Sequence, residues 1–281
     1  MLDAALRGSL LLAGLLVTGA ATCALLLPHH SRARITTLAV VASVWSVVAL
    51  PLRLFRQASA FVDVGEPVGP MLRVVLRETT WGLGWTVQLL AAFLALIGAA
   101  WWRRGGSGLP LTLAAAGLAA GSAMTGHATS GTWSPVIGVT VHAVHALAAG
   151  AWIGTLAVLV LAVLPRTRAA SDLLAIVARF SPVALVSAGV LAAGGAAMIW
   201  VVIAGPPRLL DAAWGRLLMA KLVLVGAVVA GGAWNWKRAT PAVRAGADHA
   251  RLVRGARWEL AIAMLVLLVT ALLVDSAPPE R

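Results

Sequence analysis

Charged residues are scarce in this sequence, and their scarcity excludes most classes of soluble protein. Only 11% of the 281 residues are Asp, Glu, Lys or Arg, whereas 60% are hydrophobic and the mean hydropathy is +0.93. A soluble domain carries about twice this charged fraction. Long apolar runs that lack charges need lipid around them, so the composition indicates a membrane protein.

Cysteine and the common catalytic motifs are almost absent as well. The one cysteine, Cys23, lies inside the first apolar run, so neither an internal disulfide nor a Cys-x-x-Cys metal or redox pair can form. The sequence has no P-loop, no Gly-x-Ser-x-Gly nucleophile elbow and no His-Glu-x-x-His zinc motif. We therefore predict that the protein is not an enzyme.

Apolar runs of the length of a membrane span fill most of the chain. A span needs about 20 mainly apolar residues, and in lipid it must be a helix because every backbone N–H needs an internal partner. The sequence predicts an all-α, polytopic transmembrane helix bundle of about eight spans. They are expected at residues 5–27, 35–55, 83–102, 109–126, 136–164, 181–204, 215–236 and 258–275. The first run is too long for a cleaved signal peptide, so we expect it to be retained.

Basic residues gather in alternate loops and predict the orientation. The formal net charge is +12, and the Lys and Arg residues lie mainly after the first, third, fifth and seventh spans. The positive-inside rule places these loops in the cytoplasm and both termini outside. The strongly basic loop 237–257 is expected to contact anionic lipid of the inner leaflet rather than nucleic acid.

The spacing of the runs suggests two regions. Residues 1–108 form an N-terminal three-span region with an outer loop at 56–82, and residues 109–281 form a five-span region. The second half of the loop, Met71 to Thr80, is expected to be a short amphipathic helix on the membrane surface.

A few histidines within or beside the spans are the best candidates for function, because ionisable side chains inside a membrane are costly. His127 follows the fourth span, and His142 and His145 lie early in the fifth. Residues three apart share a helix face, so His142 pairs with His145 and Met124 pairs with His127. A short connection makes these two spans neighbours, and all four side chains are predicted to meet in one site in the outer leaflet.

The ligand types narrow the choice of metal. Imidazole suits copper, zinc, iron and nickel, and the thioether of Met124 selects Cu(I). No carboxylate lies nearby, which argues against magnesium and calcium. The set favours copper, or haem with axial histidines. A purely structural role, in which the histidines hydrogen-bond to neighbouring helices, stays open at this point.

Two further features bear on the path through the membrane. Lys221 lies in the seventh span near its outer end, where its stem can carry the ammonium group outward. The sixth span contains a glycine-rich stretch from Gly189 to Gly195, which is a candidate place for the helix movement that transport requires.

Ordered motifs in the second half resemble the copper resistance D (CopD) family of bacterial inner-membrane proteins. They are Gly126-His127-Ala128, His142-Ala143-Val144-His145-Ala146-Leu147 with Ala151-Trp152-Ile153-Gly154, Arg179-Phe180-Ser181, and Trp214-Gly215-Arg216-Leu217-Leu218 leading to Lys221-Leu222. These stretches span about residues 121–240. The chain differs in having Trp214 where family members often have tyrosine, and its N-terminal half has no Met-rich or His-rich segment.

The resemblance implies a copper permease or copper-tolerance protein of the bacterial inner membrane that moves copper inward from the periplasm. It also implies a separate periplasmic copper-binding partner of the CopC type. The family's histidines correspond to His127, His142 and His145 here. The alternatives are a haem-binding membrane cytochrome that uses the same histidines, and a membrane assembly or structural protein that binds no metal.

Overall fold

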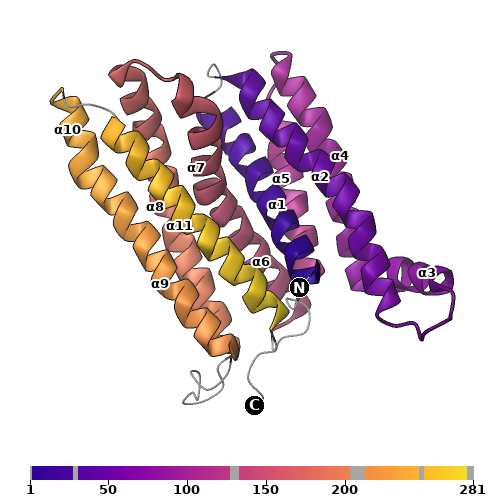
Figure 1. Cartoon of the computed structure of the whole chain (residues 1–281). Coiled ribbons are helices and arrows are strands. Elements are labelled where there is room, and N and C mark those ends of the chain that lie inside the picture. Colours follow the sequence, from indigo (N-terminus) through magenta and orange to yellow (C-terminus); the bar gives the residue numbers. More distant parts are fainter. Residues whose placement is uncertain (1, 28–30, 127–132, 203–212, 247–249, 277–281) are drawn as a thin grey trace.

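The computed structural model describes residues 2–27, 31–126, 133–202, 213–246 and 250–276. In these ranges the chain is helical and contains no strand (Figure 1). The helices are α1 (Leu2–Leu26), α2 (Arg32–Ser59), α3 (Val68–Glu78), α4 (Thr80–Arg103), α5 (Leu109–Met124), α6 (Pro135–Ala149), η2 (Gly150–Gly154), α7 (Thr155–Val158), η3 (Leu159–Val163), η4 (Leu164–Arg166), α8 (Ala170–Val202), α9 (Ala213–Trp234), η5 (Asn235–Ala239), α10 (Thr240–Arg244) and α11 (Ala250–Asp275).

The long helices have the length and composition of membrane spans. In the described ranges seven helices are long and apolar enough to cross a bilayer, and α5 is a shorter apolar helix of 16 residues. α6, η2, α7, η3 and η4 follow one another as one of these spans, and α9, η5 and α10 as another. Large apolar side chains such as Val41, Ile97, Leu185 and Val223 stay exposed on the flanks, as expected of a surface that faces lipid. The polytopic helical bundle is confirmed.

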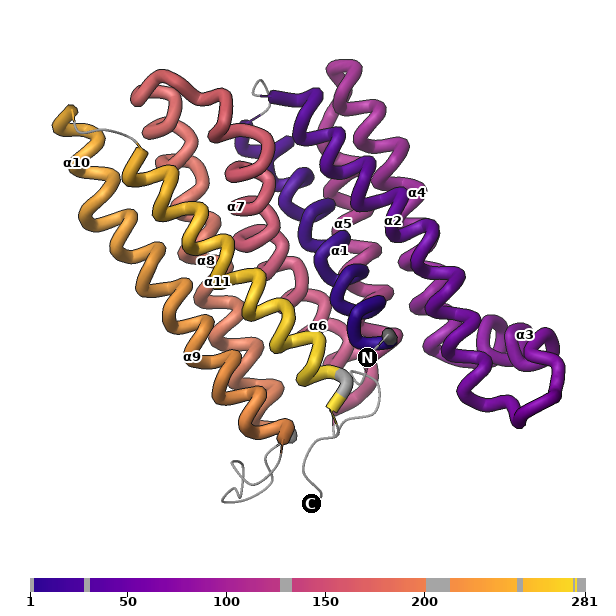
Figure 2. The backbone as a smooth tube through the Cα atoms, in the orientation of Figure 1, coloured from indigo at the N-terminus to yellow at the C-terminus, as the bar shows by residue number. Residues whose placement is uncertain are grey.

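Helix α1 is the centre of the fold. It packs against α2 and α5 on one side and against η2, α7 and α11 on the other, so it runs between the two groups of helices (Figure 2). The N-terminal group is α1, α2, α4 and α5, and the other group pairs α6 with α8 and α9 with α11. The first span therefore belongs to the contact surface of both halves.

A Gly-x-x-x-Gly pair joins the halves. Gly150 and Gly154 bracket the π-helical turn η2, and both face α1. A Cβ atom on Gly154 would overlap the backbone oxygen of Leu15, and one on Gly150 would overlap the side chain of Thr18. Gly19 of α1 makes the matching approach to the backbone of Gly154. Small residues at this spacing let two helix backbones touch, which is a main source of helix association in lipid.

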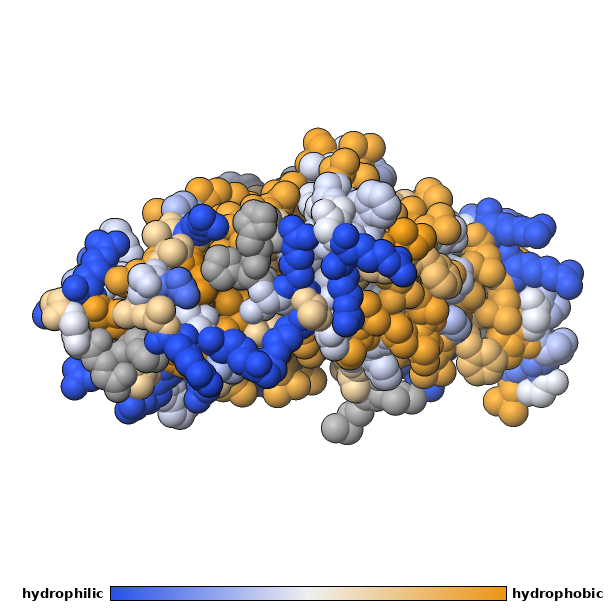
Figure 3. All heavy atoms as spheres, turned by 90° about the horizontal axis from the view of Figure 1, so that it is seen from above, coloured by the Kyte–Doolittle hydropathy of each residue, from blue (hydrophilic) through white to orange (hydrophobic). Residues whose placement is uncertain are grey.

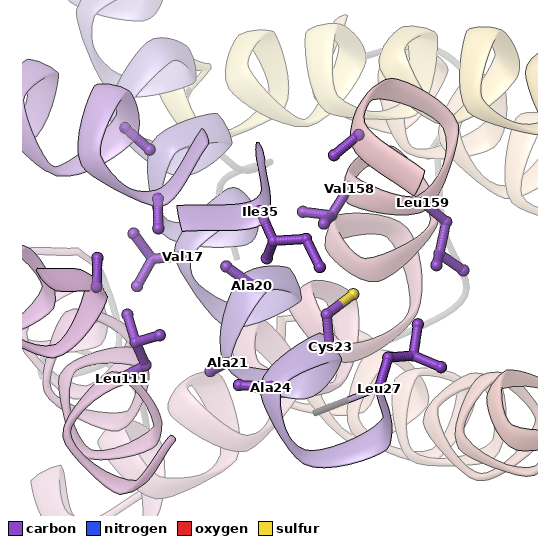
Figure 4. Close-up of a cluster of buried hydrophobic side chains, with 14 of the residues drawn as sticks. Val17, Ala20, Ala21, Cys23, Ala24, Leu27, Ile35, Leu111, Val158 and Leu159 are labelled. Atoms are coloured by element: carbon purple, nitrogen blue, oxygen red, sulfur yellow. The ribbon is translucent and has the colours of Figure 1, made fainter. Parts of the chain in front are cut away.

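The core around α1 is built mainly from small side chains. Figure 4 shows Val17, Ala20 and Cys23 of α1 facing Ile35 of α2 and Val158 of α7. All five are buried in one hydrophobic cluster. Alanine-rich faces bring helices close together, and Cys23 packs here as a small apolar residue.

The two ends of the bundle differ in charge. Arg32 and Arg34 of α2 meet Arg166 of η4 and Arg168 around one open pocket, and we call this end of the bundle the basic end. Figure 3 looks onto it and shows hydrophilic side chains gathered between hydrophobic flanks. Helix α1 begins and α11 finishes at the opposite end (Figure 1). An even number of crossings accounts for this, while the side of the membrane that each end faces stays a prediction.

The loop between α2 and α4 contains the expected short helix. α3 packs its buried Val75 against Leu54 and Ala58 of α2. Thr79 then ends α3 and caps α4, because its hydroxyl accepts a hydrogen bond from the backbone N–H of Gly82 at 3.0 Å.

Several helices extend beyond the apolar runs of the sequence. α8 begins at Ala170 and α11 at Ala250, whereas the apolar runs begin near residues 181 and 258. The added turns carry arginines such as Arg179 and Arg254. The apolar stems of these arginines can lie along the helix while the guanidinium reaches water. The helices can therefore begin before the apolar runs do. Arg179 also donates to the carbonyl of Leu26, the last residue of α1, at 3.0 Å.

Candidate metal site

The start of α6 sets the position of the histidine pair. Ser134 precedes the helix, Pro135 is its first residue, and the Ser134 hydroxyl accepts from the N–H of Ile137. Proline at the first position has the backbone angle of a helix and needs no partner for a missing N–H. His142 and His145 follow in the second and third turns of α6, and α6 begins at the end of the bundle opposite the basic end (Figure 1).

His142 presents one free ring nitrogen. Its Nδ1 lies 2.9 Å from the carbonyl oxygen of Gly138, one turn earlier in α6. A carbonyl only accepts, so Nδ1 carries the hydrogen and donates it. This leaves the lone pair of Nε2 available, which is the arrangement that holds metal-binding histidines in a fixed tautomer.

His145 is the more unusual of the two. Its side chain lies against α8, where a Cβ atom on Gly194 would be 3.3 Å from Nδ1 and one on Gly195 would be 3.9 Å from Cε1. The Nδ1 atom is buried and has no hydrogen-bond partner within the described residues. An unpartnered buried polar atom costs about 1–3 kcal/mol of stability. This nitrogen is therefore the clearest candidate to bind a metal ion or another partner from outside the described chain.

Two basic groups lie near His145, and within the described residues no acidic side chain acts on it. Both Lys221 of α9 and His142 are close enough to act on His145 electrostatically. Lys221 is half-buried in α9, and the outward reach of its ammonium group stays a prediction. A cation bound here would be held by neutral nitrogen ligands and repelled by the lysine.

The other two predicted ligands are placed less directly. Met124 ends α5 and packs toward α4, where a Cβ atom on Gly84 would be 2.6 Å from the Cβ of Met124. His127 lies outside the described residues. α5 and α6 are neighbours, as the short connection predicted, and the convergence of all four side chains stays a prediction. Within the described ranges no group of three or more His, Cys, Asp or Glu side chains is placed to hold a metal ion.

A second polar cluster lies beside the segment that leads to His127. Arg53 of α2 donates to the hydroxyl of Thr125 at 3.0 Å and to its carbonyl at 3.2 Å. Gln88 of α4, which is buried, donates to the same hydroxyl at 3.2 Å. The Arg53 guanidinium also lies over the ring of Trp81, 5.5 Å from its centre. The cluster fixes Thr125, two residues before His127.

A third polar pair joins α9 and α11 near the basic end. The side chain of Asn235 donates to Glu259, and Glu259 is the one buried acidic residue in the described part of the chain. None of Glu259, Arg53 and Gln88 was among the residues that the sequence singled out as candidates for function. The signal was nevertheless present, since each lies inside or at the edge of an apolar run, where a polar residue is a functional candidate.

Comparison with known families decides what this chain is. The model described as Copper resistance protein D-like, N-terminal domain, matches residues 1–135, and the model described as Copper resistance protein D matches residues 174–273. The chain belongs to the copper resistance protein D family. It is a copper resistance membrane protein with several membrane-spanning helices. No curated protein and no solved structure gives a significant match.

The CopD family matches leave the histidine pair between them. His127 falls in the N-terminal match, and Lys221 and Glu259 fall in the second, whereas His142 and His145 lie in the intervening residues 136–173. Gly194, which faces His145, lies in the second match. The site on α6 and α8 is therefore argued from its own geometry. The division of the chain at residue 108 stays a prediction.

Proposed function

We propose that this CopD family protein is a copper permease of the bacterial inner membrane that moves copper inward from the periplasm. The observation that carries the proposal is the pair of nitrogens on α6: Nε2 of His142, left free by the bond to Gly138, and Nδ1 of His145, buried without a partner. Imidazole suits copper, and copper is the cargo that family membership supports. We infer a transport role rather than a catalytic one.

Neutral ligands fit a transported cation. Two imidazoles add no charge to the membrane interior, so an empty site is stable without a counter-ion. His127 and Met124 are proposed to complete the site from the end of α5, with the thioether favouring Cu(I). The ammonium of Lys221 weakens binding through repulsion. Transport requires binding strong enough for entry and weak enough for release, so an opposing charge beside the ligands is consistent with a site through which ions pass.

The entry side and the partner follow from the position of the site. α6, which carries both histidines in its second and third turns, begins at the end of the bundle opposite the basic end, and the positive-inside rule assigns that end to the periplasm. A periplasmic copper-binding protein of the CopC type is the proposed donor. The arginines of the basic end are proposed to contact anionic lipid of the inner leaflet.

Metal analysis tests the proposal against the haem alternative. The purified protein, loaded anaerobically with Cu(I), is expected to retain stoichiometric copper and no iron by elemental analysis. The variant H127A/H142A/H145A is expected to lose that copper. His142 and His145 lie on one helix, whereas an axial pair binds haem from opposite faces, and this is why copper is expected rather than haem iron. Stoichiometric iron in place of copper would contradict the permease and favour a cytochrome.

The outcome in which no metal binds is equally informative. A wild-type protein that retains neither copper nor iron, or a triple variant that keeps its copper, would contradict the proposed histidine site. The third alternative, an assembly or structural role, would then stand. Circular dichroism and elution as a single species would show that the variant remains folded.

Gly194 gives a test of the site that leaves all four proposed ligands intact. We expect Gly194→Leu to reduce copper affinity by at least about tenfold, because a side chain at this position fills the space beside Nδ1 of His145. The measurement is competition for Cu(I) against a chromogenic chelator.

A matched control lies five residues earlier in the same helix. A Cβ atom on Gly189 would meet nothing within 4 Å, so Gly189→Leu adds the same bulk to α8 away from His145. Equal loss of affinity in both variants would indicate a general effect on α8 and would contradict copper binding beside Gly194.

A further inference from the structure

A polar pair, the buried Glu259 and the partly buried Asn235, joins α11 to η5 away from the histidine site. Glu259 of α11 is 8% exposed and accepts a hydrogen bond from the side-chain amide of Asn235 in η5. In the described part of the chain no salt bridge joins Glu259 to a basic side chain. A buried carboxylate without a cationic partner is strongly disfavoured, so such a group is held as the neutral acid or pairs with a cation that arrives.

Glycines on both helices are arranged to admit this pair. A Cβ atom on Gly255 of α11 would overlap the amide of Asn235, and one on Gly231 of α9 would lie 3.2 Å from Cγ of Glu259. Each helix therefore has a glycine opposite the polar side chain of the other. Asn235 also opens a π-helical turn, and the hydroxyl of Thr240 donates to its carbonyl at 3.0 Å. π-helical turns inside α-helices occur frequently at functional sites.

A pocket connects the pair to the basic end. It has a volume of about 370 Å³ and is lined by Glu259 and Asn235 together with Arg238, Arg251 and two tryptophans, Trp234 and Trp258. Both tryptophans are largely exposed, as expected of side chains at the membrane interface. Water from the cytoplasmic side can therefore reach a carboxyl group that is otherwise enclosed by apolar helices.

Two arginines line the pocket beside Glu259. Arg238 faces the pocket from η5, and its guanidinium lies over Trp234, while Arg251 faces it from α11 itself. η5 also carries Lys237, and α11 carries Arg254 and Arg257 on the turns next to Glu259. α9, which packs along α11, carries Arg216 and Lys221 in its first half, away from Asn235. α7 and η3, which also pack on α11, carry no titratable residue.

Helix α1, which also packs on α11, contributes three titratable side chains. Asp3 and Arg7 lie in its first turns at the opposite end of the bundle, and Cys23 packs in the apolar core with Val158 and Leu159.

We propose that Glu259 is a proton-binding site that holds a proton at rest and releases it to the cytoplasmic pocket when copper passes. The O–H bond of the carboxylic acid breaks, its electron pair stays on the carboxylate, and the proton passes to a water molecule in the pocket. A nearby copper cation favours the ionised form, so release of the proton follows the arrival of the metal. The coupling to copper rests on the proposed permease function, whereas the protonation of Glu259 does not.

Infrared difference spectroscopy tests the protonation without copper. The wild-type protein at neutral pH is expected to show a carboxylic-acid C=O band that shifts in deuterium oxide and disappears in Glu259→Gln. This substitution keeps the shape of the side chain and an oxygen that accepts from Asn235. Asp172→Asn serves as the control, because Asp172 is exposed at the start of α8, and the band is expected to stay. If the wild-type spectrum has no such band, or the band survives in Glu259→Gln, Glu259 is ionised and the proposal is overturned.

Proteoliposomes test the coupling. Wild-type copper uptake is expected to slow as the pH on the cytoplasmic side is lowered, because a high proton concentration opposes release. In Glu259→Gln this pH dependence is expected to vanish, while stoichiometric copper binding at the histidine site remains. Uptake of the variant with unchanged pH dependence would overturn the coupling. If the wild-type protein moves no copper at all, the permease function fails, and the infrared result still decides whether Glu259 holds the proton.

Discussion

Copper uptake by proteoliposomes is expected to fall about 100-fold in His145→Ala, a loss of about 2.8 kcal/mol of interaction with the ion. His145 carries the buried nitrogen that no group in the described chain satisfies. Alanine removes this ligand and leaves an apolar space beside Gly194, so the ion loses half of the imidazole pair. The measurement is the initial rate of Cu(I) uptake, with the protein content of the vesicles held equal.

Two further variants separate ligation from packing. His145→Met supplies a soft thioether in place of the imidazole, so it is expected to recover part of the Cu(I) uptake. Val144→Ala removes a neighbouring side chain that is exposed on the bundle surface and is expected to change uptake little. If His145→Ala transports like the wild type, or if Val144→Ala loses as much, the histidine is not a copper ligand.

The bundle itself is expected to fail to assemble when Gly154 is replaced by valine. The added Cβ atom would overlap the backbone oxygen of Leu15, and backbone atoms cannot move aside as a flexible side chain can. Overpacking of a close interface costs about 1–3 kcal/mol and sometimes more. Because α1 packs against both groups of helices, moving η2 away from α1 weakens the contact between the two groups. We expect little folded monomer on size-exclusion chromatography, and a melting temperature lower by about 10 °C in any that remains.

Gly14→Val is the matched control on α1. A Cβ atom at Gly14 would meet nothing within 4 Å, so this substitution is expected to leave both the yield and the melting temperature close to those of the wild type. A Gly154→Val protein that is as abundant and as stable as Gly14→Val would show that the contact between α1 and η2 does not hold the halves together.

The helical class and the approximate places of the membrane spans could be predicted from the sequence because hydropathy determines them in a membrane, whereas the π-helical turns within two of the spans were not predicted. Each of the eight apolar runs became an apolar helix, since a backbone in lipid has no other way to satisfy its hydrogen bonds. The short helix α3 was predicted for a different reason, the amphipathic pattern of its residues in the loop between two spans. The first residues of α8 and α11 were not predicted, because a helix can begin before its apolar run when the stems of arginine side chains cover the added turns.

The candidate site was predictable in part. The spacing of His142 and His145 places them on one face of one helix whatever surrounds it. Which neighbour that face meets was not predictable, because the pairing of apolar helices depends on small residues whose partners lie far away in the chain. Met124 packs toward Gly84 of α4 and His145 toward Gly194 of α8, and neither contact has a local signal.

The sequence by itself determined that this is a helical membrane protein, which residues lie within its spans, and which few polar side chains in them require an explanation. Only the tertiary structure decided that α1 lies between the halves, that Nδ1 of His145 is buried with no partner among the described residues, and that Asn235 meets Glu259 across two helices. The physical reason is the range of the forces involved. Transfer into lipid acts on each segment separately, and so it can be read along the chain. Close packing and polar pairing act between segments distant in sequence, and they exist only when the bundle has formed.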